Sequence, residues 1–100
     1  MGRMIYTRVH KGKDDTILAA CDEDVLGKTF SGNGMKMIVS ERFYNEELVP
    51  EEVFVDLMGS VTIMNLVGER TVSLAIENGI VSEDDVIEIG GVRHVQVVKI

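Results

Sequence analysis

Short apolar runs separated by charged or glycine-containing segments organise this chain. The first two runs, Met4–Val9 and Thr16–Cys21, flank the polar segment Lys11–Asp15, which is typical of two strands joined by a tight turn. We therefore expect an antiparallel hairpin at the start of the chain. If its turn is symmetric, the facing pairs are Val9 with Leu18 and Thr7 with Ala20.

The segment that follows this hairpin is predicted to be irregular apart from one strand. Asp22 can cap a single helical turn over Glu23–Leu26, and Gly27 can end that turn. The glycine-rich segment Ser31–Gly34 favours a loop. Met35–Val39 is predicted as a third strand because its apolar residues alternate with polar ones.

Two helices are predicted in the second half of the chain. Pro50 suits the first position of a helix that ends at Gly59, and the acidic residues after Pro50 complement the helix dipole. The second helix is expected over Leu66–Asn78, with Asn65 as its cap. The intervening segment Val61–Met64 is compatible with a strand or a helix.

The C-terminal segment has the pattern of a second hairpin. Val86–Ile89 and Val92–Lys99 flank the pair Gly90-Gly91, and two glycines between two apolar runs favour a two-residue turn. This arrangement would place Glu88 opposite Arg93. Together with the earlier elements it predicts one α+β domain over residues 1–100, a two-layer α/β sandwich. Two main helices would pack on a largely antiparallel sheet of four or five strands.

Composition limits the function classes. Hydrophobic residues make up 45% of the chain, enough for a core without disulfides or an obligatory metal, and the single cysteine excludes an internal disulfide. We expect no metal and no cofactor. The apolar runs are shorter than a membrane span requires, and no secretory signal pattern begins the chain, so we expect a cytoplasmic protein. The net charge of −7 disfavours RNA binding through phosphate contacts.

Two motifs near the end of the first hairpin invite a chemical interpretation. Gly27, Lys28 and Thr29 match the end of a phosphate-binding loop, but Asp22 stands where that loop needs its first glycine, and its charge would repel a phosphate. Cys21 would need a positive neighbour to act as a nucleophile, and His94 is the base available. We interpret Cys21 chiefly as a core residue, and Lys28 as solvated.

Polar residues also gather in two later segments. Asn65, Gly68, Glu69 and Arg70 surround the expected helix entrance, where free N–H groups can hold an anion and Arg70 can add a forked donor. The alternative is that these residues cap and solvate the helix. In the last strand, His94 and Gln96 share one face, and Arg93 the other. Arg93, His94 and Gln96 would form either a structural network or a polar pocket.

These segments carry a family resemblance. The stretch Ala20–Phe30, the segment Asn65–Arg70, the helix end Ala75–Gly79 and the terminal Ile89–Gln96 resemble the archaeal domain of unknown function 424 family over essentially the whole chain. The resemblance implies an archaeal cytoplasmic protein with a compact α/β fold, and it implies no activity. One departure is Arg93, where many members are expected to have proline.

Two classes of function stay open from the sequence. The first is a non-enzymatic binding module with a protein partner, by analogy associated with translation or RNA metabolism, because the acidic surface suits a basic partner. The second is a small enzyme or ligand-binding protein whose pocket, between Asn65–Arg70 and Arg93–Gln96, accepts an anion. It requires those segments to converge. A homo-oligomer paired through an uncovered edge strand is a third expectation.

Overall fold

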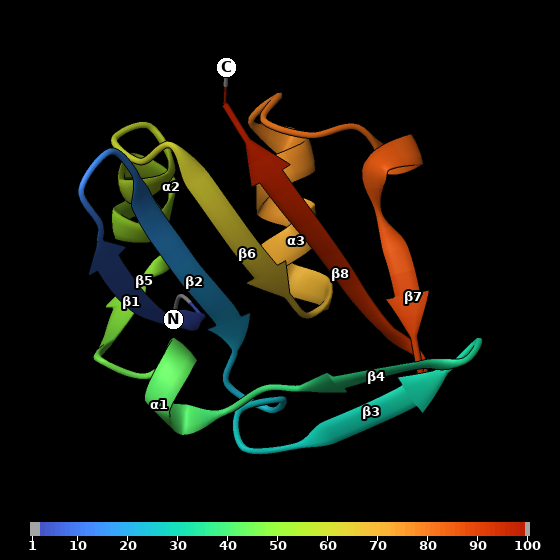
Figure 1. Cartoon of the computed structure of the whole chain (residues 1–100). Coiled ribbons are helices and arrows are strands. Elements are labelled where there is room, and N and C mark those ends of the chain that lie inside the picture. The colour runs from blue at the N-terminus through green and yellow to red at the C-terminus, as the bar shows by residue number, and fades with distance from the viewer. Residues whose placement is uncertain (1–2, 100) are drawn as a thin grey trace.

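Six strands form one mixed sheet in the computed structural model, which describes residues 3–99. Figure 1 shows how the elements are arranged. The strand order is β5-β1-β2-β6-β8-β7, and β3 and β4 form a separate hairpin. The strands are β1 (Met4–Lys11), β2 (Thr16–Asp22), β3 (Thr29–Gly32), β4 (Met35–Ile38), β5 (Glu47–Pro50), β6 (Ile63–Val67), β7 (Ile87–Ile89) and β8 (Val92–Val98). The helices are α1 (Glu41–Tyr44), α2 (Glu51–Met58), α3 (Glu69–Glu77) and the 3-10 turn η1 (Glu83–Asp85).

All neighbouring strands of the six-stranded sheet are antiparallel except β2 and β6, which are parallel. The first hairpin has the predicted register, in which Val9 faces Leu18 and Thr7 faces Ala20. The second hairpin turns at Gly90 and Gly91, whose φ angles of 59° and 83° suit the tight two-residue turn that only glycine adopts freely.

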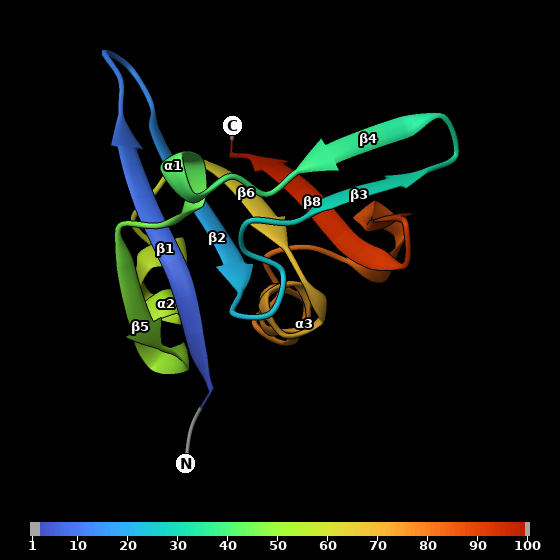
Figure 2. The same cartoon turned by 90° about the horizontal axis from the view of Figure 1, so that it is seen from below.

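Both faces of the sheet are covered, one of them only in part. Helices α2 and α3 pack on one face over a core that includes Leu18, Phe54 and Leu66, all fully buried. On the other face, α1 and the β3–β4 hairpin cover a second core around Cys21, Val39 and Tyr44 (Figure 2). The expected sheet of four or five strands was therefore too small, and the two-layer description accounts for one face only.

The second helix begins later than predicted. Leu66 and Val67 belong to β6, which is buried between β2 and β8, and α3 starts at Glu69 after Gly68. Asn65 lies inside β6 and is not a helix cap. Only Asn65 is polar in this strand, so its sequence lacks the strict alternation of apolar and polar residues that marks a strand.

Three further elements differ from the prediction. The segment after Asp22 is a turn without helix, and Asp22 does not cap it through its side chain. The expected loop at Ser31 is part of β3, and the four-residue elements α1 and β5 had no distinct pattern. Pro50 ends β5 and serves as the N-cap of α2.

Candidate interaction face

Alternation along the strands places every second side chain on the face of the sheet opposite α2 and α3. The strand registers align these side chains in rows across the sheet. The first row contains Leu48, Tyr6, Cys21, Val67, His94 and Ile87, and α1 and the β3–β4 hairpin cover its centre. The next two rows contain Arg8, Ala19, Asn65 and Gln96, then His10, Ile17, Ile63 and Val98.

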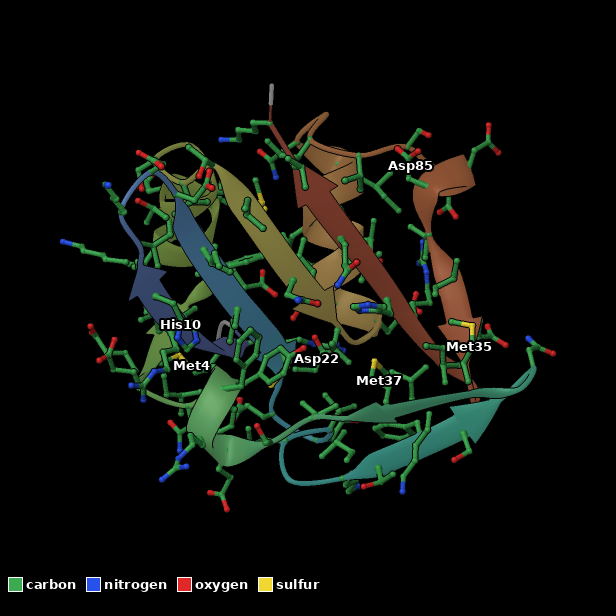
Figure 3. The ribbon with its side chains drawn as sticks, viewed as in Figure 1. Met4, His10, Asp22, Met35, Met37 and Asp85 are labelled. Carbon is green, nitrogen blue, oxygen red and sulfur yellow. The ribbon has the colours of Figure 1, made fainter. Side chains whose placement is uncertain are left out.

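Much of the second and third rows is left uncovered, and we call this part of the sheet the open face. It is defined by Arg8, Ile17, Ile63, Asn65, Gln96 and Val98, which are half-buried or exposed, with His94 at its border. Figure 3 views this face, with His10 toward one side, Met37 of β4 below it and Asp85 near the opposite edge. The side chain of His10 stacks on Phe43 of α1, with ring centroids 4.5 Å apart.

His94 is held by the strand beside it. Its Nδ1 lies 2.9 Å from the carbonyl oxygen of Leu66, and because a carbonyl only accepts, Nδ1 carries the proton. In residues 3–99 the other ring nitrogen, Nε2, has no protein hydrogen-bond partner. His94 also lines a cavity of about 220 Å³ together with Asp85, Ile87, Val95 and Gln96. His94 can therefore offer one nitrogen to a ligand or a partner on the open face.

The predicted candidate residues converge only in part. Gly68, Glu69 and Arg93 line one cavity of about 150 Å³, together with the acidic residues Asp22 and Asp24. His94, Gln96 and Asn65 do not line this cavity.

Asn65 and Gln96 are cross-strand neighbours on the open face, next to His94 in the adjoining row. Arg93 points to the helix-covered side, where it contacts α3, and Glu69 and Arg70 lie on α3 itself. The alternation within β8 is the physical reason, since neighbouring residues of a strand face opposite ways.

Both arginines of the expected anion site are engaged by carboxylates. Arg93 bonds Glu69 at 3.2 Å and Glu83 at 3.0 Å, and its side chain is only 17% exposed. It faces Glu88 in the register but does not pair with it. Arg70 forms a two-pronged contact with Glu51 of α2, which lowers the pKa of the Glu51 carboxyl. Arg70 therefore links α3 to α2, and Arg93 links β8 to α3 and η1.

The entrance of α3 is occupied by the side chain of Asp22. Its two oxygens accept the backbone N–H groups of Arg70 at 2.9 Å and Thr71 at 2.8 Å, and the Thr71 hydroxyl donates at 2.6 Å. Gly68 makes this approach feasible, because a Cβ at that position would lie 2.4 Å from the Asp22 Cγ. A carboxylate of the chain itself thus fills the position where an anion would bind.

The neighbouring cavity is also unsuited to an anion. It measures about 230 Å³, and its lining includes the carboxylates of Asp22, Glu23, Asp24 and Glu69 against the guanidinium groups of Arg3 and Arg70. Arg70 is already paired. Four acidic groups around one cavity repel an anionic ligand. The geometry therefore disfavours the predicted anion-accepting pocket at this helix entrance.

Cys21 is a core residue, as the sequence indicated. It is fully buried, and burial together with Asp22 and Asp24 raises the pKa of its thiol to about 12. Val67 lies between Cys21 and His94 in the same row, which separates their strands by about 10 Å. The thiol therefore has neither the thiolate form nor the base that a nucleophile requires.

We expect Cys21 to resist alkylation in the folded protein. Iodoacetamide at pH 8.5 should modify it at a rate set by global unfolding, because the reagent needs an accessible thiolate. The measurement is the modified fraction by intact mass spectrometry across a urea series, with glutathione as a reactive control. Modification within minutes in the absence of urea would contradict this assignment.

Lys28 is exposed, and its carbonyl accepts the N–H of Val39. Across residues 3–99, no group of three or more His, Cys, Asp or Glu side chains is arranged to hold a metal ion. No helix in this described range is long and apolar enough to cross a membrane.

Sequence reasoning missed four residues of the open face, namely Arg8, Ile17, Ile63 and Val98. Alternation in the first hairpin would have placed Arg8 and Ile17 on opposite strands of one face. The sequence could not show which side of the sheet α2 and α3 cover. Both pack on the other side, and α1 covers only part of this one. Three-dimensional placement was needed to find the face.

The fold and the open face define a small α+β protein with a mixed six-stranded sheet. The chain belongs to the family described as protein of unknown function (DUF424), whose model matches residues 10–100. This confirms the resemblance found in the sequence. A crystal structure of an uncharacterized conserved protein from Methanopyrus kandleri is similar to it, with 28% identity and a TM-score of 0.81, covering 97% of this chain and 94% of that chain. No protein with a curated description matches the chain.

Proposed function

We propose that this protein is a non-enzymatic binding module and that the open face recognises a protein partner. The observation that supports this most strongly is the division of the candidate residues. Contacts within the fold already engage the side chains of Arg70, Arg93 and Asp22. The open face, by contrast, presents the amide side chains of Asn65 and Gln96 and one ring nitrogen of His94.

The composition of the open face is suited to binding another protein. Ile17, Ile63 and Val98 contribute apolar area, and Val98 is 66% exposed. Asn65 and Gln96 contribute amide groups that both donate and accept. A mixture of apolar area and neutral polar groups is typical of protein interfaces, where charged residues are depleted at the centre.

A catalytic role for His94 has less support. Of the side chains that share its cavity, only the Asp85 carboxyl could exchange a proton with a substrate, and it bonds the Ser82 backbone and hydroxyl at 3.0 and 3.3 Å. The arginines that were expected to hold an anionic substrate are paired elsewhere. Association with translation or RNA metabolism stays a prediction by analogy, and the net charge of −7 favours a basic protein over RNA.

The experiment is site-specific photo-crosslinking in lysate of the source organism. A photoreactive amino acid at Asn65 samples the open face, and the same group at the exposed Glu52 of α2 samples the helix side. We expect at least about tenfold more crosslinked protein from position 65, unchanged by nuclease, as a specific interface would give. Equal crosslinking at both positions, or crosslinks lost with nuclease, would argue against a protein partner on this face.

A further inference from the structure

The outer edge of β8 is only half covered. Strand β7 has three residues and pairs with β8 through Ile87–His94, Glu88–Arg93 and Ile89–Val92. Beyond His94 the chain of β7 turns away into η1, while β8 continues to Val98 beside β6 (Figure 1). The second half of β8 therefore has a strand neighbour on one side only.

The hydrogen bonds show which backbone groups this leaves unpaired. The backbone carbonyl of Arg93 accepts from the N–H of Gly68, and the N–H of Lys99 donates to the carbonyl of Thr62. The backbone N–H and C=O groups of the odd-numbered residues of β8 therefore point toward β6. Backbone groups of successive residues in a strand point to opposite sides. The N–H and C=O of Gln96 and Val98 therefore point outward, and within residues 3–99 they have no protein hydrogen-bond partner.

A cavity and a group of acidic side chains lie beside this edge of the sheet. The cavity of about 220 Å³ is bounded by His94, Gln96, Ile87 and Asp85, between β8 and η1. Three consecutive carboxylates form η1, and of these Glu83 is paired with Arg93. Asp84 and Asp85 are exposed, and the Asp85 carboxylate keeps its negative charge while it accepts hydrogen bonds from Ser82. A strand that approaches β8 here therefore meets unpaired backbone groups and negative charge together.

We propose that an extended, basic segment of a partner protein adds to the sheet as a strand along Gln96–Val98. Its backbone would pair with the N–H and C=O of Gln96 and Val98, as in other cases of strand addition to a sheet edge. A lysine or arginine of the segment would lie near Asp85. This inference rests on the proposed binding role and specifies the kind of partner and the atoms that recognise it.

The test uses a synthetic heptapeptide of alternating lysine and valine as the probe. Three matched peptides accompany it. Two are N-methylated on alternate residues, one for each edge of the strand, and the third has glutamate in place of lysine. Binding to the full-length ¹⁵N-labelled protein is followed by NMR. We expect the Gln96 and Val98 amides to shift and to gain at least about tenfold protection from hydrogen exchange, as newly paired amides do.

The variant Gln96→Pro removes the outward N–H and leaves the bonds to β6 intact, as proline does at sheet edges. It should fold, with a Tm within about 5 °C of the parent, and bind the probe at least about tenfold more weakly. The control is Lys11→Pro, which removes an outward N–H at the opposite side of the sheet, where the backbone of β1 points away from β2. It should bind the probe as the parent does.

The outcomes separate this inference from the function on which it rests. If both N-methylated peptides bind as well as the probe, or if Gln96→Pro binds normally, strand addition is wrong. If Asn65 still crosslinks a protein in that case, the open face remains the recognition surface. Should Gln96→Pro fail to fold, the N-methylated peptides and the exchange data still decide.

The same protein and peptides distinguish two alternative partners of the β8 edge, namely a second copy of this chain and RNA. A concentration-dependent dimer in sedimentation, with the Gln96 amide protected and no probe bound, would show that a second copy pairs along β8 and would overturn the proposal. Displacement of the probe by an oligouridylate, with shifts of the same amides, would assign the edge to RNA. Equal binding of the glutamate peptide would overturn the requirement for a basic segment.

Discussion

Replacement of Gly68 by alanine should destabilise the protein by about 4 kcal/mol. Gly68 has φ 111° and ψ 155°, a backbone region that is essentially restricted to glycine and costs other residues about 1–3 kcal/mol. In addition, the new Cβ would lie 2.4 Å from the Asp22 Cγ. The Asp22 carboxylate would then have to leave the helix entrance, which gives up its bonds at a further cost of about 1–3 kcal/mol.

A second glycine serves as the matched control for Gly68. Gly79 also has a positive φ, of 72°, but a Cβ there would meet no atom within 4 Å. Gly79→Ala should cost about 1 kcal/mol, the backbone term alone. Equilibrium urea unfolding of both variants gives the difference. Equal losses in the two variants would show that contact between Gly68 and Asp22 is unimportant.

Loss of the Asp22 carboxylate should itself cost about 2–3 kcal/mol. Asp22→Ala removes the acceptor of three hydrogen bonds from Arg70 and Thr71, and bonds to a charged group are among the stronger ones. The N-terminal turn of α3 would lose its cap and its link to β2. Asp22→Asn keeps one oxygen and should lie between the parent and the alanine variant.

The control for Asp22 is the nearby exposed Asp24, whose replacement by alanine should change stability by less than about 0.5 kcal/mol. Thermal and urea unfolding measure the stabilities, and the amide exchange of Thr71 shows whether the loss is local to α3. If Asp22→Ala and Asp24→Ala have the same stability, the cap contributes nothing measurable and the account of the α3 entrance is wrong.

Local features of the fold were predictable because short-range rules determine them. The polar turn fixed the register of the first hairpin, and Gly90-Gly91 fixed that of the second. The strand β6 was predictable only in part. Val61–Met64 was compatible with a strand or a helix, and Leu66 and Val67 were assigned to the helix, because the segment lacks strict alternation. The short elements α1 and β5 depend on contacts with β1, which no local pattern records.

The candidate site was predictable only in part for the same reason. Alternation along β8 indicated that His94 and Gln96 share a face, and the structure places Asn65 beside them. The partners of Arg70 and Arg93 lie 7 to 24 residues away, and the Asp22 cap joins residues 48 and 49 apart. Long-range pairing of this kind follows from the register of the sheet, which local sequence does not reveal.

The parallel pairing of β2 with β6 has a consequence for how the chain folds. The two strands are separated by residues 23–62, which include the β3–β4 hairpin, α1, β5 and α2, so the centre of the sheet closes only after a long segment has been brought round. Closing such a segment costs entropy before its contacts form, and domains rich in distant strand pairs fold slowly, in about milliseconds to seconds. We therefore expect each hairpin to form early, and the joining of β2 to β6 to be the rate-limiting step of folding.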